Sequence, residues 1–290
     1  MTRPLVVGYT ATPAGADAIA VASRLAAALG APLELIMVTP LTARGGVVPP
    51  LDGYTDHLRE QSRQWLREAT ALVPKGISTA AHVRGAESFA EGLVNAAAEF
   101  GASHIVIGAA NSGSFGRHRL GSVANDLLHA SDVAVVLAPA GYAGVTTPIT
   151  RLTAAVGERA GSDALLEEAV SLATATGAEL RLVSLVAIDM PANLDTQALQ
   201  LAGVTHANEL LTQATATLPA EVKAEAIIAS GTSIEDAVAR LDWSDGEVVI
   251  VGSSRLAQPR RLFLGSTASK MLRVLPVPMI VVPRTRNEGN

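Results

Sequence analysis

The sequence repeats itself, and the second half follows the first at a nearly constant distance. A short apolar run at residues 5–9 recurs at 152–156, and a second run at 33–38 recurs at 180–185. Both pairs are offset by 147 residues (5 to 152 and 33 to 180). In each half, the first run is followed by a turn and then by apolar residues at helical spacing. A repeat of this kind predicts two copies of one supersecondary unit.

The apolar runs predict strands of a parallel sheet. They are nearly continuous in Val, Ile and Leu, which is typical of strands buried on both faces. Further runs occupy residues 105–107 and 133–137 in the first half, and 248–251 and 277–282 in the second. Strands that alternate with helical segments indicate an α/β fold, here two tandem doubly wound parallel-sheet domains. We place the domains at residues 1–140 and 150–285, with a linker rich in Pro, Gly and Thr over residues 138–150.

Composition excludes several classes of site. The chain has no cysteine, so disulfides, thiolate metal sites and a cysteine nucleophile are excluded. Its six histidines lie far apart with no metal-binding spacing, and we expect no tightly bound metal. A net charge of −5 without a basic run argues against a nucleic-acid partner. No apolar stretch reaches the ~18 residues of a membrane span, and no signal segment is evident. We therefore expect a cytoplasmic protein without a membrane partner.

Each half carries the same glycine pattern after its fourth predicted strand. Gly108 is followed by Gly121-Ser122, and Gly252 by Gly265-Ser266, both at an offset of 144 residues (108 to 252 and 121 to 265). Glycine at the end of a strand lets the backbone turn sharply and approach a ligand. Gly-Ser at the start of the next helix exposes backbone N–H groups to an anion, at the sheet edge where α/β folds bind ligands. The pattern predicts a phosphate site.

With these loops the sequence resembles the universal stress protein family, whose ATP-binding members carry G-x2-G-x9-G-(S/T). The resemblance covers nearly the whole chain twice and implies a regulatory protein of stress adaptation with ATP as its cofactor. The backbone at Val38 is implied to meet the adenine. The resemblance implies that the remaining nucleotide-binding positions are Gly108, Gly121, Ser122, Val123, Gly252, Arg255, Gly265, Ser266 and Thr267.

The sequence departs from the family pattern at two places in each half. The middle glycine is Asn111 or Arg255, and the acidic residue expected after the first strand is Thr10 or Gly157. Two interpretations stay open: the loops bind nucleotide, or their glycines are turn residues that the fold retains. If one site survives, we expect the second, because basic side chains in its loop would offset phosphate charge. These are Arg255, Arg260 and Arg261.

No catalytic motif accompanies the loops. The chain has neither a Walker A sequence nor a G-x-S-x-G elbow, and serines at helix starts usually cap N–H groups. We expect no dedicated enzyme. The alternatives are a slow ATP-hydrolysing or nucleotidyl-transfer enzyme on the same fold, and a structural dimerisation module that binds no nucleotide.

The last strand of each half predicts how the domains associate. Residues 133–137 and 277–282 each follow the final helix and should lie at a sheet edge. Because bare apolar edges aggregate, proteins cover or pair them. We predict that the two domains pair through these strands within one chain, and a homodimer is a further candidate. Trp243, shortly before the fourth predicted strand of the second half, is expected to cover a helix end.

Overall fold

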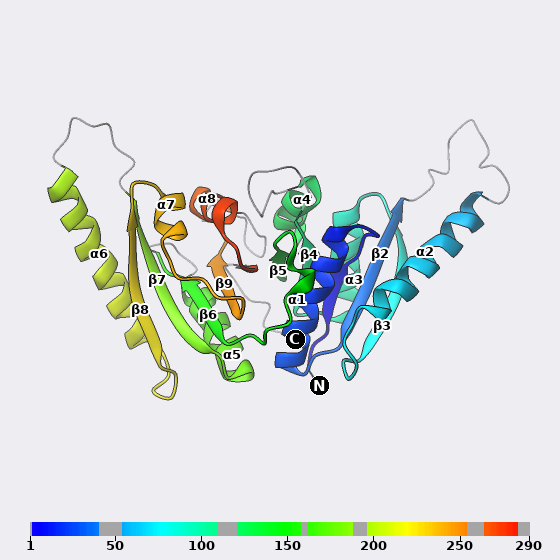
Figure 1. Cartoon of the computed structure of the whole chain (residues 1–290), viewed down its shortest axis with the longest axis horizontal. Helices are drawn as coiled ribbons and strands as arrows, with labels where there is room; N and C mark the ends of the chain where they lie inside the picture. The colour runs from blue at the N-terminus through cyan, green and yellow to red at the C-terminus, as the bar shows by residue number, and fades with distance from the viewer. Residues whose placement is uncertain are drawn as a thin grey trace. The chain divides into compact units, whose positions relative to one another are not determined.

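The computed structural model describes residues 2–40, 54–109, 121–157, 162–187, 196–253 and 264–283. The chain forms two compact units, and along the described residues the division falls between Thr146 and Thr147. Each unit is an α/β domain with a parallel sheet (Figure 1). Among the described helices, none combines the length and the apolar character that crossing a membrane requires.

The first unit builds its sheet in the order β3-β2-β1-β4-β5, with helices between successive strands. The described pairings of β1 with β2 and β4, of β2 with β3 and of β4 with β5 are all parallel. The elements are β1 (Leu5–Gly8), α1 (Pro13–Leu29), β2 (Leu33–Pro40), α2 (Tyr54–Ala71), β3 (Thr79–Ala86), α3 (Phe89–Phe100), β4 (His104–Gly108), α4 (Ser122–Ala130), β5 (Ala134–Ala138) and the 3-10 turn η1 (Tyr142–Gly144).

The second unit repeats this topology in the order β8-β7-β6-β9-β10. Its register matches as well: Val7 pairs with Leu35 in the first unit, and Ala154 pairs with Leu182 in the second. The elements are β6 (Arg151–Ala155), α5 (Ser162–Thr176), β7 (Glu179–Ala187), α6 (Thr196–Ala216), β8 (Ala224–Gly231), α7 (Ile234–Ala239), β9 (Glu247–Gly252), α8 (Ser266–Val274) and β10 (Met279–Val282). The predicted fold class is confirmed.

The central strands are buried on both faces, as their composition predicted. Every residue of β1 is buried, and β1 is contacted by both α1 and α3. β3 and β8, which sequence analysis did not identify, end the two strand orders, and all but one residue of each strand is half-buried or exposed. Trp243 covers a helix end as expected, because its indole N–H donates to the carbonyl of Val238 at 2.9 Å in α7.

The linker between the units is anchored to the first unit by Asp17. This aspartate of α1 is 1% exposed, and its two carboxylate oxygens accept the N–H groups of Gly141 (3.0 Å) and Ala143 (2.7 Å). Arg24, two turns further along α1, donates to the Tyr142 hydroxyl at 2.7 Å and lies over its ring. A carboxylate near the start of a helix usually interacts favourably with the positive end of the helix dipole. Here it holds a 3-10 turn of the linker.

We expect Asp17→Ala to destabilise the first unit by about 1–3 kcal/mol, because two partly buried hydrogen bonds to a charged acceptor are lost. Equilibrium unfolding in urea would measure this loss. Asp126→Ala, which removes an exposed carboxylate from α4, is the matched control and should stay within about 0.5 kcal/mol of the original chain. Equal stability of the two variants would contradict the role assigned to Asp17.

A buried charge network lies at the amino ends of β6, β7 and β9 in the second unit. The Glu247 carboxylate is fully buried and accepts from Arg181, from the Thr153 hydroxyl and from Arg151, the last at 2.6 Å. Burial lowers the pKa of Arg181 from its usual value, because desolvation outweighs the attraction of Glu247. Burial acts in the same direction on Arg151, but the hydrogen bond and charge of Glu247 prevail and raise its pKa. Arg181 also lies over the Trp243 ring.

Glu247→Ala should destabilise the second unit by about 3–5 kcal/mol, since it leaves the buried Arg181 without its counter-charge. The double variant Glu247→Leu with Arg181→Met removes both charges and should lose less than the single variant. Chemical denaturation of both proteins would compare them. A double variant less stable than Glu247→Ala would show that the pair contributes more than mutual neutralisation.

The final strands lie where the sequence predicted within each unit. β5 ends the strand order of the first unit and β10 ends that of the second, and every side chain of both is buried. The pairing of the two domains through these strands stays a prediction. If it is right, residues 1–146 and 147–290 produced as separate chains should form a one-to-one complex, measured by analytical ultracentrifugation. Two monomeric species at micromolar concentration would contradict it.

Candidate functional site

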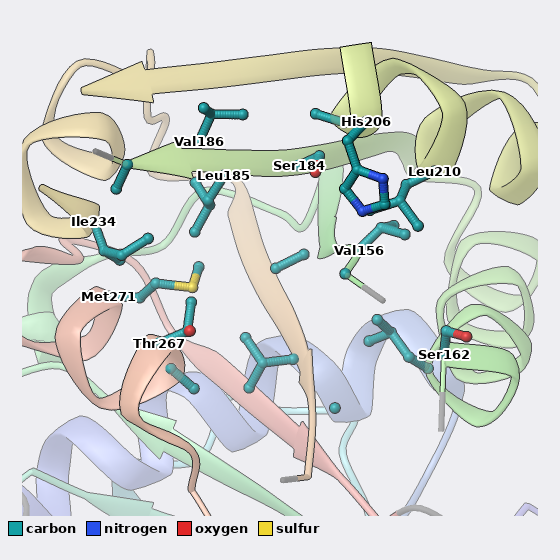
Figure 2. A pocket seen from close by; sticks show the side chains of 18 of the residues that line it. Val156, Ser162, Ser184, Leu185, Val186, His206, Leu210, Ile234, Thr267 and Met271 are labelled. Atoms are coloured by element: carbon teal, nitrogen blue, oxygen red, sulfur yellow. The ribbon is translucent and has the colours of Figure 1, made fainter. Parts of the chain in front are cut away.

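A pocket of about 390 Å³ opens at the carboxyl ends of β6, β7 and β9 in the second unit (Figure 2). The strand ends supply its floor, and the first turns of α5, α7 and α8 and the inner face of α6 supply its walls. Helix α6 runs close above β7, since a Cβ added at Gly203 would lie 2.9 Å from Val186 Cγ1. The pocket occupies the sheet edge at which α/β folds bind ligands.

The described lining of this pocket is mainly apolar. Polar side chains are contributed by Ser162 of α5, Ser184 of β7, His206 of α6, Ser253 directly after β9 and Thr267 of α8. In Figure 2, Thr267 and Met271 lie across the pocket from His206 and Leu210. No carboxylate, lysine or arginine is among the described lining residues. Elsewhere in the described ranges, no three His, Asp or Glu side chains gather closely enough to hold a metal ion.

The helices at the sheet edge begin in two different ways. α3 and α7 begin with a capping box, in which Ser88 or Ser233 accepts the N–H of a residue three positions on. In α7 that residue is Asp236, whose pKa is lowered, first by the N–H of Thr232 that its carboxylate accepts. α4 and α8 begin at Gly121 and Gly265, and no side chain caps either helix. The N–H groups at the start of α4 and α8 are therefore left to other acceptors.

Some of the predicted site residues of the second unit line this pocket. Gly252 ends β9 and Thr267 lies in the first turn of α8, and both line the pocket. Gly265 and Ser266 begin α8 directly before Thr267 and are not among the described lining residues. Arg255 lies outside the described residues, as do Arg260 and Arg261.

The predicted residues of the first unit occupy the matching strand and helix ends. Gly108 ends β4, Gly121 precedes α4, and Ser122 and Val123 form the first turn of α4. Val38 lies in β2, where its side chain packs against Gly92 of α3, a Cβ on which would be 2.6 Å from Val38 Cγ2. Asn111 lies outside the described residues.

Gly108 is required by the close approach of the protein's own backbone. A Cβ at this position would collide with the carbonyl oxygen of Ala14 in the first turn of α1. The space beside Gly108 is therefore occupied by α1. In the first unit this favours the interpretation that the glycine is a turn residue that the fold retains.

The residue that follows the first strand differs in size between the two units. Tyr9 stands 147 positions before Val156 (9 to 156), and Val156 lines the pocket of the second unit. Tyr9 is 6% exposed, and its ring lies 2.9 Å from where a Cβ on Gly15 would be. Burial raises the pKa of the Tyr9 phenol, and so does the nearby negative charge of Glu68 on α2. The larger Tyr9 side chain therefore packs beside α1 in the first unit, at the position where the smaller Val156 lines the pocket of the second.

The positions at which ATP-binding relatives were expected to carry an acid also differ. The Thr10 hydroxyl is hydrogen-bonded to the Thr12 hydroxyl at 2.8 Å, just before α1. Gly157 faces open space, because a Cβ added there would meet nothing within 4 Å.

Sequence analysis missed the contributions of α6 and α7 to the pocket, and in β7 it missed the Ser184 side chain. Ser184 carried a signal, since it is a hydroxyl within an otherwise apolar strand, where the first half has Met37 (37 to 184). No sequence signal pointed to His206, because a single histidine on a long helix is compatible with many structural roles. Ile234 lies in α7, a helix that the sequence did not reveal.

A doubled parallel α/β domain with glycine-opened helices at its carboxyl edge defines a protein of the universal stress class. The chain belongs to the universal stress protein family, whose model matches residues 1–139 and again residues 148–283. A universal stress protein of Mycobacterium tuberculosis is 28% identical over 96% of this chain and 99% of its own length.

Two solved structures share the fold along nearly the whole chain. A universal stress protein of Archaeoglobus fulgidus superposes with a TM-score of 0.65 at 20% identity, covering 97% of this chain and 98% of that one. The cytoplasmic domain of a prokaryotic cation chloride cotransporter superposes with a TM-score of 0.51 at 12% identity, covering 98% and 96%.

Proposed function

We propose that this chain is a regulatory protein of stress adaptation that binds an adenine nucleotide in its second unit. The observation that carries the proposal is the pocket at the ends of β6, β7 and β9, which adjoins the glycine-opened start of α8. At the matching positions of the first unit, Tyr9 replaces Val156, and the backbone of Ala14 in α1 lies against Gly108.

The start of α8 supports phosphate binding at one end of the pocket. Gly265 has extended backbone angles (φ −66°, ψ 165°) and carries no side chain that could cap the helix. The first N–H groups of a helix have no acceptor within the helix and lie at the positive end of its dipole, and both properties favour an anion at the start of α8. α7 starts at the same sheet edge, but Ser233 already accepts one of its first N–H groups, so fewer donors are left for an anion.

The remainder of the pocket supports binding of a base and its sugar. Its volume of about 390 Å³ lies at the small end of the range for ligand pockets, and its walls are mostly aliphatic with a few polar groups. Apolar walls suit the faces of a heteroaromatic ring, and isolated hydroxyls suit its polar edge.

Catalysis receives less support than binding. General acid–base chemistry on a phosphate needs a positioned carboxylate, lysine or histidine, and of these the described lining contributes His206 alone. We propose that the chain binds nucleotide without dedicated turnover. We also propose a cytoplasmic location and a homodimer. A structural module that binds no nucleotide is the alternative that the next experiment tests.

Val156→Tyr, which copies the first unit's tyrosine into the second pocket, should abolish nucleotide binding. The original chain should gain about 2.7 kcal/mol of stability when ATP is present at a hundredfold excess over Kd. Thermal denaturation with ATP, ADP and AMP, each with and without Mg²⁺, would measure this gain as a rise of a few degrees in Tm.

Tyr9→Phe is the matched control, because it keeps the ring that fills the first unit and should leave the ligand-induced shift unchanged. A shift that persists in Val156→Tyr but disappears in Tyr9→Phe would place the site in the first unit. No shift with any nucleotide in the original chain would favour the structural module.

A further inference from the structure

Ser184 is a largely buried residue whose hydroxyl opens into the pocket. The residue is 4% exposed and lines the pocket from β7, and its side chain makes no hydrogen bond to any described residue. Among the described buried serines, the hydroxyl of Ser131 donates to the carbonyl of Val133 at 2.8 Å, whereas that of Ser23 has no partner. The Ser184 hydroxyl differs from that of Ser23 because it lines a pocket, where a bound molecule can complete its hydrogen bond.

The position of Ser184 separates it from the phosphate end of the pocket. Thr267 and Met271 at the start of α8 lie on one side, and Ser184 lies toward His206 and α6 on the other (Figure 2). A nucleotide whose phosphates meet α8 therefore extends its base toward β7 and α6. Val186 and Gly203 are in close contact there, and the apolar side chains of Leu185 and Leu210 line the same part of the pocket.

We propose that the Ser184 hydroxyl is the specificity contact of this pocket and accepts a hydrogen bond from the exocyclic amino group of the base. The inference rests on the proposed nucleotide binding and adds to it the residue that selects the base. A site that must satisfy a buried polar group rejects a ligand lacking the matching group more strongly than apolar walls can. The first unit has Met37 at this position, which offers no comparable contact.

Calorimetric titration of the full-length protein with two probes tests the proposal. The probes are AMP and purine riboside 5′-monophosphate, which lacks the 6-amino group and is otherwise identical. The original chain should bind AMP about tenfold more tightly than the analogue. Ser184→Ala should weaken AMP about tenfold and leave the analogue unchanged, so that the discrimination disappears.

Ser23→Ala is the matched control. Ser23 of α1 is also 4% exposed and its hydroxyl has no partner, but it lies in the first unit away from the pocket. This variant should bind both probes as the original chain does. Because Ser184→Ala removes an unpaired hydroxyl, its Tm without ligand should be no lower than that of the original chain. Ser184→Cys gives a second variant of similar size if the alanine protein folds poorly.

The outcomes separate this inference from the proposed function. If the original chain binds neither probe, both proposals are overturned. If it binds AMP and the analogue equally well, or if Ser184→Ala binds AMP unchanged, nucleotide binding stands and the assignment of Ser184 is overturned. A loss of AMP affinity in Ser23→Ala as large as in Ser184→Ala would also overturn it, because the effect would then not come from the pocket.

Discussion

Burial of the central strands on both faces is the constraint on which the rest of each unit depends. A strand such as β1, with every residue buried, can exist only beneath helices on both sides. Helices therefore cover both faces of the sheet, and the polar side chains of a binding site are placed at the ends of the strands. The two units differ most there: Tyr9 against Val156, Thr10 against Gly157, and Met37 against Ser184.

The starts of the helices show where the protein satisfies its own backbone and where it does not. Ser88 and Ser233 each accept one N–H group in the first turn of α3 or α7. In return, the carboxylates of Glu91 and Asp236 accept the N–H groups of Glu87 and Thr232, just before these helices. The box recurs in both units, so it belongs to the common fold. α4 and α8 share the opposite property and begin at glycine without a cap. Because both arrangements recur, an uncapped start is a feature of the fold rather than a defect of one helix.

Much of the fold could be predicted from sequence, because the central strands are apolar and the pattern occurs twice. β1, β2, β4 and β5 and their counterparts were visible as Val, Ile and Leu runs. β3 and β8 were missed because each is an outer strand with exposed positions, so its composition resembles a loop. α7 was missed because a helix of 6 residues is too short to show a period. The repeat located Gly252 and Thr267 at the pocket, whereas Ser184 and His206 depend on how α6 packs against β7, which no local pattern encodes.

The hydrogen bonds between Asp17 and the linker also limit how far the second unit can move from the first. The linker is held as far as the 3-10 turn at residues 142–144, and the Thr150 N–H already bonds the carbonyl of Gly246. Residues 145–149 connect these two points along the described chain, and five fully extended residues reach at most about 18 Å. A tether this short keeps the local concentration of one unit near the other in the millimolar range. Any association between the units is thus independent of how much of the protein the cell makes, in contrast to the same units carried on separate chains.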